Sequence, residues 1–367
     1  MTVVGMLHET PYTLMRDYVD FPAPNSNFDP VGGHALYEEH LSEMALADEL
    51  GFEVLALPEQ HSKQDNIDPS PNLLAARALS VTKRIKILPY GAILPLHNPL
   101  RIAEEFAMLD VISQGRLLAG FVRGGPTNYL AYGLDYFKAS ESFEEAWDLI
   151  VKAWTTHEPF RWAGVHYNFD NVSVWPRPYQ SPHPPLHTAG GGSVDHAAKS
   201  EATLGLGFTT TDDEVDLVFG RYRQAYRDAH QRGTPGEKLA VARSVYVAES
   251  DLKAREESER HILHQYRVLY KPSMIANQVL AKAANRHLYW ADRLFLTEEG
   301  YEGLSKRGNH IAGSPETVLN TIQQQQEKLG FGSFLGLFRY GDMPHERAAK
   351  SMKLFAEQVM PKLRRSS

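Results

Sequence analysis

Apolar and polar residues follow two different periods along this chain, and their order predicts a repeated strand–helix unit. Short apolar runs such as Val3–Leu7, Val54–Leu57 and Leu186–Ala189 are typical of strands buried on both faces. Between such runs, apolar residues recur about every 3.6 positions, as in a helix with one buried face. The predicted strands cover residues 3–7, 54–57, 85–88, 117–122, 186–189, 207–210, 239–247 and 334–338. The predicted helices cover residues 35–50, 72–81, 99–113, 140–156, 194–204, 216–232, 251–270, 314–329 and 344–360.

The stretch 85–125 shows this unit most clearly. Pro99 suits the first turn of a helix, and Gly115 is a typical left-handed residue after its end. Strand, helix and strand at this spacing form a βαβ unit with parallel strands. The first strand is followed by Tyr90-Gly91-Ala92 and the second by Arg123-Gly124-Gly125. Since ligands of α/β proteins bind beyond the carboxyl ends of strands, we expect both segments to lie at a site.

Eight strands that alternate with helices predict an α/β fold, a (β/α)8 TIM barrel formed by a single domain over 1–367. A doubly wound open sheet is the alternative fold. Three insertions are expected. Residues 10–33 are rich in Pro, Asn, Asp and Gly, 157–186 predict a short β-excursion and an extended connector, and 271–312 break the period. We expect the first and third insertions to cover the barrel mouth.

Composition excludes several classes of function. The chain is 43% hydrophobic and 23% charged, and its net charge of −7 disfavours binding to nucleic acid or to anionic membranes. It contains no cysteine, which removes disulfides, thiolate catalysis and sulfur-ligated metals. Dense metal-ligand spacing such as HExxH is absent, so no metal is expected. Neither a signal peptide nor a membrane span is evident, which predicts a cytoplasmic protein.

Two segments offer groups for an anionic ligand. Gly190-Gly191-Gly192-Ser193 follows a strand and precedes a helix, so its backbone N–H groups can approach an anion at a helix N-terminus. Ser193 can cap that helix, bind phosphate, or do both. Arg123 offers a bidentate fork to phosphate oxygens. A plain loop and a solvated surface arginine are the structural alternatives.

Candidate proton-transfer groups follow the first two strands. Glu59 and His61 come directly after residues 54–57, and imidazole titrates near neutral pH. His61 could act on a bound intermediate or orient Glu59, although a hydrogen-bonded structural histidine is an equally good interpretation. His8 and Glu9 hold the same place after the first strand.

The chain resembles the bacterial luciferase-like flavin-dependent monooxygenases, which are (β/α)8 barrels. The segments that carry this resemblance are LADELGFEVLALPEQH at 46–61, LPLHNPLRIAEEFAMLDVISQGRLLAGFVRG at 94–124, YGLD at 132–135, GSPETVLNTIQQ at 313–324 and SMKLFAEQVMP at 351–361. The resemblance implies that reduced FMN, supplied by a separate flavin reductase, binds at the barrel mouth. It also implies that O2 is activated there as a peroxyflavin.

The same resemblance suggests roles for individual residues. Arg123 corresponds to a phosphate-contacting arginine, and the turn 190–193 to the family's phosphate loop. The segment 90–92 corresponds to a non-prolyl cis peptide under the flavin ring. Gln60 stands where the family commonly has a histidine, and glutamine cannot shuttle a proton. Glu141 replaces a second phosphate-binding arginine, so more of the phosphate contact is expected from Arg123 and the turn.

These observations predict a two-component monooxygenase that uses reduced FMN and O2 to oxidise a small, largely apolar organic substrate. Aromatic residues near the strand ends would build a dry pocket for it, and they are Phe28, Tyr90, Tyr129, Tyr136 and Trp290. A deazaflavin-dependent hydride-transferring oxidoreductase and a non-catalytic flavin-binding protein remain as alternatives. By resemblance, a homodimer and a transient contact with the reductase are expected.

Overall fold

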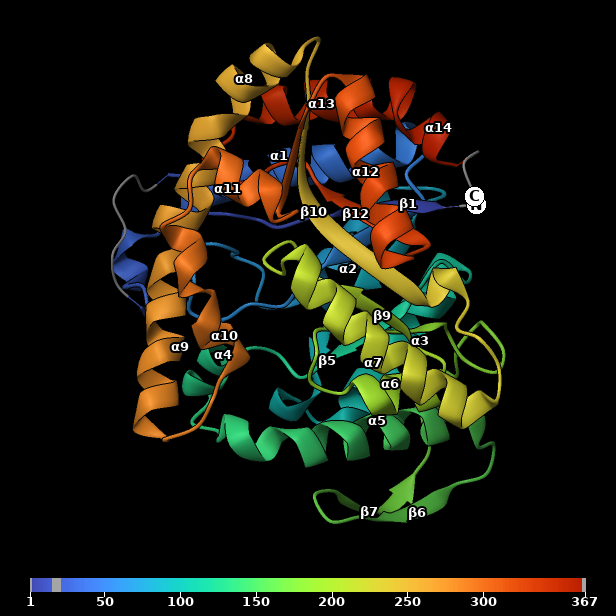
Figure 1. The fold of residues 1–367 in the computed structure, drawn as a ribbon. Coiled ribbons are helices and arrows are strands. Elements are labelled where there is room, and N and C mark those ends of the chain that lie inside the picture. Colours follow the sequence, from blue (N-terminus) through green and yellow to red (C-terminus); the bar gives the residue numbers. More distant parts are fainter. Residues whose placement is uncertain (1, 15–20, 365–367) are drawn as a thin grey trace.

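The computed structural model of this protein describes residues 2–14 and 21–364, and it shows a ring of parallel strands surrounded by helices (Figure 1). Hydrogen bonds join the strands in the order β3-β2-β1-β12-β10-β9-β8-β5-β4. A parallel bridge between Ile87 and Leu117 closes the ring between β3 and the segment that leads into β5. The predicted (β/α)8 barrel is therefore confirmed. The strands are β1 (Val3–Leu7), β2 (Val54–Leu57), β3 (Lys86–Pro89), β4 (Ala92–Ile93), β5 (Ala119–Val122), β8 (Leu186–Ala189), β9 (Thr203–Leu206), β10 (Leu239–Val247), β11 (His310–Gly313) and β12 (Ser333–Leu337).

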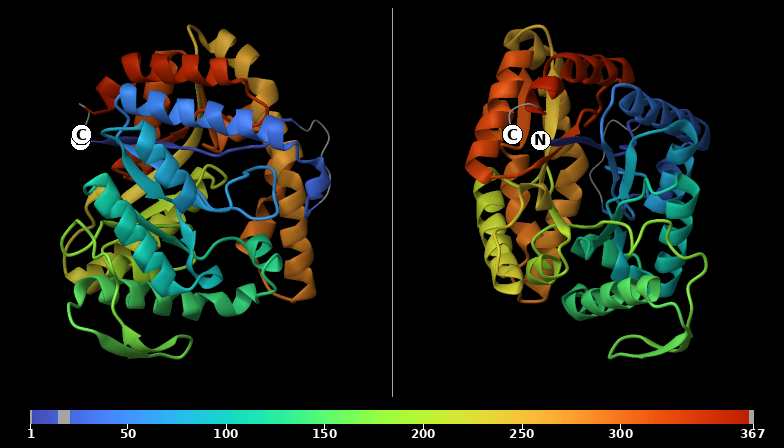
Figure 2. Two further views of the ribbon diagram at one scale, coloured as in Figure 1. Left: turned by 180° about the vertical axis from the view of Figure 1, so that it is seen from behind. Right: turned by 90° about the vertical axis from the view of Figure 1, so that its right-hand side faces the viewer.

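Helices cover the outside of the ring, with α1, α2 and α3 on one side and α7, α12 and α13 on another (Figure 2). Among the described residues the helices are α1 (Pro30–Glu49), α2 (Pro71–Val81), α3 (Pro99–Ser113), α4 (Pro126–Leu130), α5 (Ala139–Thr155), α6 (Val194–Lys199), α7 (Asp212–His230), α8 (Asp251–His264), α9 (Lys271–Ala283), α10 (Tyr289–Asp292), α11 (Tyr301–Lys306), α12 (Pro315–Leu329), α13 (His345–Gln358) and α14 (Met360–Leu363). In the part of the chain that the structure describes, the helices are too short or too polar to cross a lipid bilayer.

The two faces of each barrel strand pack into different apolar clusters. In β1, Val4 and Met6 face outward and pack with residues of the surrounding helices. Leu7 belongs to the inner cluster, together with Leu88 and Leu335 of other strands. Successive side chains of a strand point to opposite faces, so odd-numbered residues of β1 face the barrel interior. The inner cluster also includes Tyr266 and Tyr270, which follow α8 in the chain.

Several predicted boundaries are wrong for identifiable reasons. Helix α1 begins at Pro30 rather than at 35, because the side chain of Asp29 accepts hydrogen bonds from the N–H groups of Val31 and Gly32. The sixth barrel strand is β9, four residues before the predicted 207–210, since pairing with β8 and β10 sets its register. Residues 271–312 are mostly helical, and β11 at their end adds to β10.

The predicted β-excursion is an antiparallel hairpin of β6 (Phe160–Ala163) and β7 (Asn168–Val172) at one end of the molecule (Figure 1). A single carboxylate on α5 holds its turn. Glu145 accepts hydrogen bonds from the backbone N–H groups of residues 165, 166 and 167 and from Trp162 Nε1, at 2.8–3.1 Å. Apolar packing of Leu149 and Ala153 of α5 against Val172 of β7 adds a second contact between the hairpin and the barrel.

Candidate active site

The predicted phosphate-binding groups come together at the carboxyl ends of β5 and β8, which are neighbours in the ring. The guanidinium group of Arg123 lies so close to Gly192 that a Cβ atom there would be 2.9 Å from Arg123 Cζ. Only glycine therefore fits beside the arginine in its present position. Gly190 adopts a positive φ of 84°, and its N–H donates to the carbonyl of Gly205 on β9. Four residues of the turn and one arginine thus form a single cradle.

Two tyrosines position Arg123. Its Nη2 donates a hydrogen bond of 2.7 Å to the hydroxyl of Tyr136, whose ring centroid lies 4.8 Å from Cζ. The hydroxyl of buried Tyr129 donates to the backbone carbonyl of Arg123, and the two tyrosine rings pack edge to face. These contacts hold the guanidinium group toward the glycine turn. Arg123 is thus a half-buried residue with a fixed direction, and the surface-arginine alternative is wrong.

The hydroxyl group of Ser193 belongs to the cradle but does not act as a helix cap. Its hydroxyl is buried, has no hydrogen-bond partner, and does not cap α6. A buried hydroxyl without a partner costs about 1–3 kcal/mol unless a ligand satisfies it. Helix α6 ends at Lys199 instead of 204, so its dipole is small. The hydroxyl, the backbone N–H groups and Arg123 are therefore the groups that fit a phosphate.

Glu59 and His61 form a buried network that includes a residue the sequence analysis did not weigh. Glu59 Oε1 lies 2.8 Å from Nε2 of both His61 and His97, and its Oε2 accepts from the N–H of Ile93 at 3.0 Å. The hydroxyl of Tyr132 lies 3.4 Å from His61 Nδ1. His97 follows the third barrel strand and directly precedes the N-cap of α3, so its place at a strand end was the available signal.

The charges of this network are set by its hydrogen bonds. Burial raises the pKa of Glu59, but the two imidazoles and the Ile93 N–H outweigh burial, so its pKa lies below the usual range. Burial lowers the pKa of His97, and the nearby Glu59 carboxylate more than reverses this effect. Glu59 is therefore an ionised carboxylate that favours a protonated imidazole beside it.

The segment 90–92 links this network to the barrel floor. The Tyr90–Gly91 peptide is cis, as the resemblance implies. A Cβ atom at Gly91 would lie 2.6 Å from the carbonyl oxygen of Gly120, so the close approach of the two strands requires glycine. The hydroxyl of Tyr90 crosses the barrel interior and donates to the carbonyl of Thr188 on β8. Ala92 is buried and pairs with β5.

Helix α4 contacts both the network of Glu59 and His61 and the cradle around Arg123. Its Asn128 accepts a hydrogen bond of 3.2 Å from the N–H of His61, and its Tyr129 holds the Arg123 carbonyl. The ends of β2, β3, β5 and β8 therefore contribute to one connected region. The structure brings Glu59, His61 and the segments 90–92 and 190–193 together with Arg123, whereas His8 lies on the outer side of the barrel against His40.

Three other residues have their partners outside the cradle and the network, and they are Gln60, Glu141 and Arg339. Gln60 turns away from the network and accepts from Lys63 at 2.9 Å. Glu141 is exposed and lies 3.6 Å from His166 of the hairpin. The guanidinium group of Arg339, after β12, is buried against Glu39 and Glu43 of α1. The side chain of Trp290 lies outside the described part of the structure.

One group of possible metal ligands occurs within the described residues, on the outer side of β1. Ligand atoms of His8, His40 and Glu43 lie within 4.8 Å of one another. The other carboxylate oxygen of Glu43 is 2.8 Å from both Arg339 Nη1 and His345 Nδ1, so a cation already compensates its charge. The expectation that no metal binds stays a prediction.

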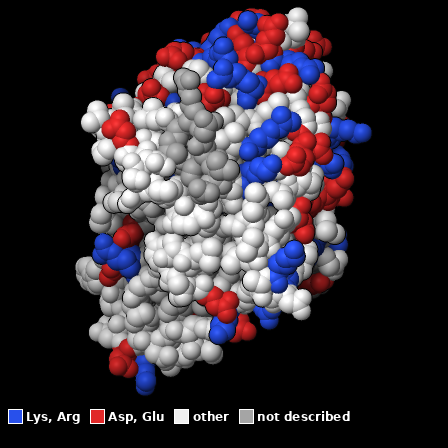
Figure 3. Space-filling model, turned by 90° about the vertical axis from the view of Figure 1, so that its left-hand side faces the viewer, with Lys and Arg blue, Asp and Glu red and all other residues white. Residues whose placement is uncertain are grey.

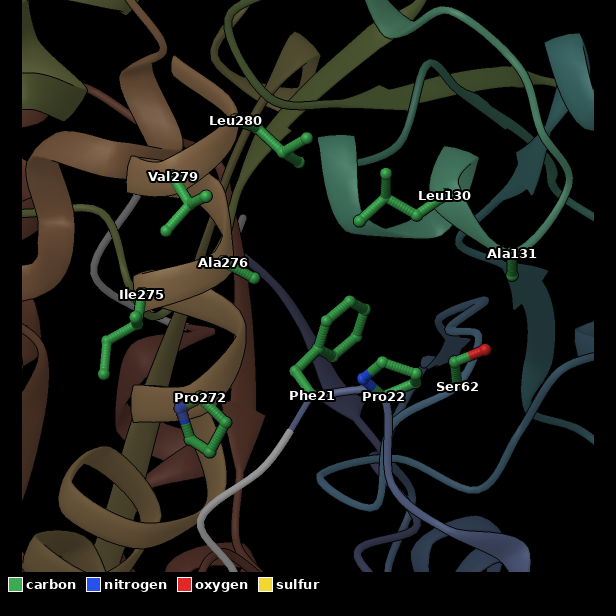
Figure 4. Close-up of a pocket in the computed structure, with 10 residues that line it drawn as sticks. All are labelled: Phe21, Pro22, Ser62, Leu130, Ala131, Pro272, Ile275, Ala276, Val279 and Leu280. Carbon is green, nitrogen blue, oxygen red and sulfur yellow. The ribbon is translucent and has the colours of Figure 1, made fainter. Parts of the chain in front are cut away.

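A largely apolar cavity of about 530 Å³ opens beside the network. It lies between α9 and α4, with Leu280 and Leu130 pointing toward one another and Phe21 beside Pro22 below them in the view (Figure 4). Ser62, next to His61 in the chain, also lines it. The face of the molecule over α9 is mostly uncharged, whereas Lys, Arg, Asp and Glu gather at the end formed by α8 (Figure 3).

Comparisons with known proteins agree with this geometry. Residues 23–332 match the family model described as luciferase-like monooxygenase. A flavin-dependent trigonelline monooxygenase, oxygenase component, from Acinetobacter baylyi is 25% identical over 335 residues, 89% of each chain. Limonene 1,2-monooxygenase from Rhodococcus erythropolis is 27% identical over 94% of this chain and 86% of the relative. The oxygenating constituent of 3,6-diketocamphane monooxygenase from Pseudomonas putida, solved in complex with FMN, has a TM-score of 0.77 at 20% identity, with 99% of each chain covered.

The closed ring of eight parallel strands places the chain in the class of (β/α)8 barrels. Within that class, the chain belongs to the luciferase-like monooxygenase family, and it is an enzyme of the flavin-dependent monooxygenase type.

Proposed function

We propose that the protein is the oxygenase component of a two-component system, which takes reduced FMN from a separate reductase and uses O2 to oxidise a small, largely apolar substrate. The observation that carries this proposal is the cradle of Arg123, Gly190, Gly191, Gly192 and Ser193. It joins a fixed cation, a turn without side chains and a buried hydroxyl without a partner. These are the groups that an FMN phosphate requires.

The residues of this chain would have separate roles in binding the flavin and in proton transfer. Arg123 and Ser193 would hold the phosphate, and by resemblance to the family the segment Tyr90-Gly91-Ala92 at the end of β3 would lie under the flavin ring. Bound FMN, once reduced, supplies the electrons and the reaction with O2. His61, held by Glu59 and Tyr132, is placed to hold or move a proton at Nε2 or Nδ1.

The cavity between α4 and α9 supports an uncharged substrate. Its lining offers one hydroxyl, that of Ser62, among apolar side chains such as Leu130, Ile275 and Leu280. A charged molecule would lose its hydration there without gaining a partner. Because Ser62 follows His61 in the chain, a molecule in this cavity would lie near the proton-transfer network. We therefore expect substrates with a predominantly hydrocarbon body.

Homodimer formation is part of the proposal. Helix α3 exposes three large apolar side chains on its outer face, Met108, Val111 and Ile112, each between 41% and 57% exposed. Such a patch commonly marks a contact between proteins. Light scattering of the wild type and of Ile112→Lys tests this point, and a monomeric wild type would contradict it.

Anaerobic titrations with two reduced flavins test the flavin assignment. Reduced FMN should bind more tightly than reduced riboflavin, which lacks the phosphate, and Arg123→Ala should remove most of this difference. One charge-assisted contact contributes about 1.5–3 kcal/mol, so the loss is about 10- to 100-fold. Equal affinities of the wild type for the two flavins would contradict the cradle. Tight binding of a reduced deazaflavin in place of FMN would favour the hydride-transferring alternative.

A reductase-coupled assay separates catalysis from flavin binding alone. With a flavin reductase, NADH and a panel of apolar alkenes, ketones and aldehydes, an oxygenase should form oxidised product in step with O2 uptake. A protein that binds reduced FMN and releases only hydrogen peroxide with every member of the panel would be the non-catalytic alternative.

A further inference from the structure

Glu9 lies at the floor of the barrel mouth. The two-residue period of β1 sends His8 outward, where its ring packs 4.8 Å from that of His40 on α1. The same period places Glu9 on the inner face, directly after Leu7 of the inner cluster. Its side chain is buried, with 7% of its surface exposed. A buried carboxyl group therefore stands on the inner face of the barrel, at the end where the cradle and His61 lie.

The partners of Glu9 come from a π-helical segment, η5 (Gln265–Tyr270), that follows α8. The hydroxyl of Tyr270 lies 2.5 Å from Glu9 Oε2, and Gln265 Nε2 lies 3.4 Å from the same atom. Single π-helical turns inside longer helices occur frequently at functional sites. Here the wider turn directs both donors of η5 at one carboxyl oxygen.

Two other strand ends hold these donors in place. The ring of Tyr270 stacks on Phe208, after β9, with centroids 5.7 Å apart. The amide oxygen of Gln265 accepts from the N–H of Gly341, after β12, at 2.7 Å. The position of the Glu9 carboxyl group is therefore fixed from the ends of β1, β9 and β12, across the mouth from the cradle at β5 and β8.

The surroundings of Glu9 keep its carboxyl group neutral. Burial raises its pKa to about 8, although the hydrogen bond from Tyr270 opposes this effect. Asp65, in the loop after β2, raises the pKa of Glu9 further, and Lys63 of the same loop lowers it. Tyr266 of η5 also faces Glu9, as an uncharged phenol whose own pKa burial raises. A pKa above neutrality favours the protonated form of Glu9 at pH 7, beside two donors that can stabilise the carboxylate after the proton leaves.

We propose that Glu9 is a proton donor of the barrel mouth, which protonates the oxygen atom that leaves during the reaction. The inference rests on the proposed function, whose balance is S + O2 + FMNH2 → SO + FMN + H2O. One oxygen atom enters the substrate S, and the other leaves with the proton of the Glu9 O–H group. Tyr270 and Gln265 then hold the carboxylate until it regains a proton, so Glu9 gives and recovers one proton in each turnover.

The protonation of Glu9 can be observed without flavin. Infrared difference spectra of the protein alone, recorded from about pH 6 to about pH 10, should show a protonated carboxyl band that titrates near pH 8. The band should be missing in Glu9→Gln, which keeps the shape of the side chain and an oxygen that accepts from Tyr270. An unchanged spectrum of Glu9→Gln would overturn the proposal.

The release of hydrogen peroxide from protein-bound reduced FMN and O2 tests proton donation without an identified substrate. The reaction FMNH2 + O2 → FMN + H2O2 also requires a proton on the leaving oxygen, so its rate should fall above about pH 8 in the wild type. In Glu9→Gln the rate should fall at least about 100-fold and lose this pH dependence.

Two further variants separate proton donation from a structural role. Tyr270→Phe removes a hydrogen bond that favours the carboxylate, so the fall in rate should move to higher pH. Tyr266→Phe makes the same change within η5, where the lost partner, the carbonyl of Phe208, keeps a second donor in Asn309 Nδ2. This control should retain the wild-type pH profile.

The binding of reduced FMN, measured for each variant, distinguishes a failure of the role of Glu9 from a failure of the proposed function. Normal binding with an unaltered pH profile in Glu9→Gln would overturn the role of Glu9 and leave the proposed function intact. Absence of reduced FMN binding in the wild type would overturn both.

Discussion

The cradle predicts a strong effect from one added methyl group, at Gly192. A Cβ atom there would lie 2.9 Å from Cζ and Nη2 of Arg123 and 3.1 Å from Nε. Ordinary contact begins at 3.4 Å, so the guanidinium group must move by about 0.5 Å or more. The arginine side chain is flexible, so Gly192→Ala should fold normally. The movement would, however, lengthen the 2.7 Å bond to Tyr136 and turn the cation away from a phosphate.

The expected result is a loss of affinity for reduced FMN in Gly192→Ala of about 10- to 100-fold, the equivalent of one charge-assisted hydrogen bond of about 1.5–3 kcal/mol. Anaerobic titration measures it, with thermal unfolding as the check on folding. Gly220→Ala on α7 is the control, since a Cβ atom there meets no neighbour within 4 Å.

A double-mutant cycle tests whether the added methyl group weakens flavin binding by displacing Arg123. If the methyl group acts by displacing Arg123, then Gly192→Ala should have little effect in an Arg123→Ala background. Equal losses in both backgrounds would refute the reasoning, because they would show that the methyl group blocks the ligand itself. Wild-type affinity in Gly192→Ala would refute the cradle.

Three further predictions concern the stability of the scaffold. Burial lowers the pKa of His310 to about 3, so the unfolded chain alone binds this proton as the pH falls below about 6.5. Neutral His310 thus stabilises the fold at neutral pH, and about 2 kcal/mol of this stability is lost by pH 5. In urea titrations, the free energy of unfolding of His310→Gln should therefore fall by about 2 kcal/mol less than that of the wild type over this pH range. Arg339→Met should destabilise the fold by about 3–5 kcal/mol, because it leaves the buried Glu43 carboxylate with less compensation; a change below about 1 kcal/mol would argue against this ion pair. Glu145→Ala should speed hydrogen exchange of residues 160–172 without a change in flavin affinity, and an unaltered exchange rate would show that the hairpin is held elsewhere.

The sequence predicted the barrel because local periodicity is strong where each strand is buried on both faces. The bounds of β1, β2, β8 and β10 were predicted without error. For β9 the prediction was wrong, because its neighbours in the ring determine where it pairs.

Residues of the candidate site could be named individually from the sequence, since each follows a strand. Which of these residues contact one another could not be predicted from the sequence. His97 reaches Glu59 across 38 positions of sequence, and Glu9 reaches Tyr270 across 261. Arg339 follows β12 as Arg123 follows β5, yet it is directed at two carboxylates of α1 rather than at the mouth.

The sequence by itself thus determined which elements form, the parallel order of strand and helix, and the end of the barrel at which polar groups gather. Closure of the ring decided the rest. It brought the ends of β5 and β8 side by side, set Arg123 against a glycine, and placed a carboxylic acid of β1 under the hydroxyl of Tyr270. Periodicity is a property of neighbours along the chain, whereas the charge state of a buried group depends on neighbours in space, which only the folded barrel supplies.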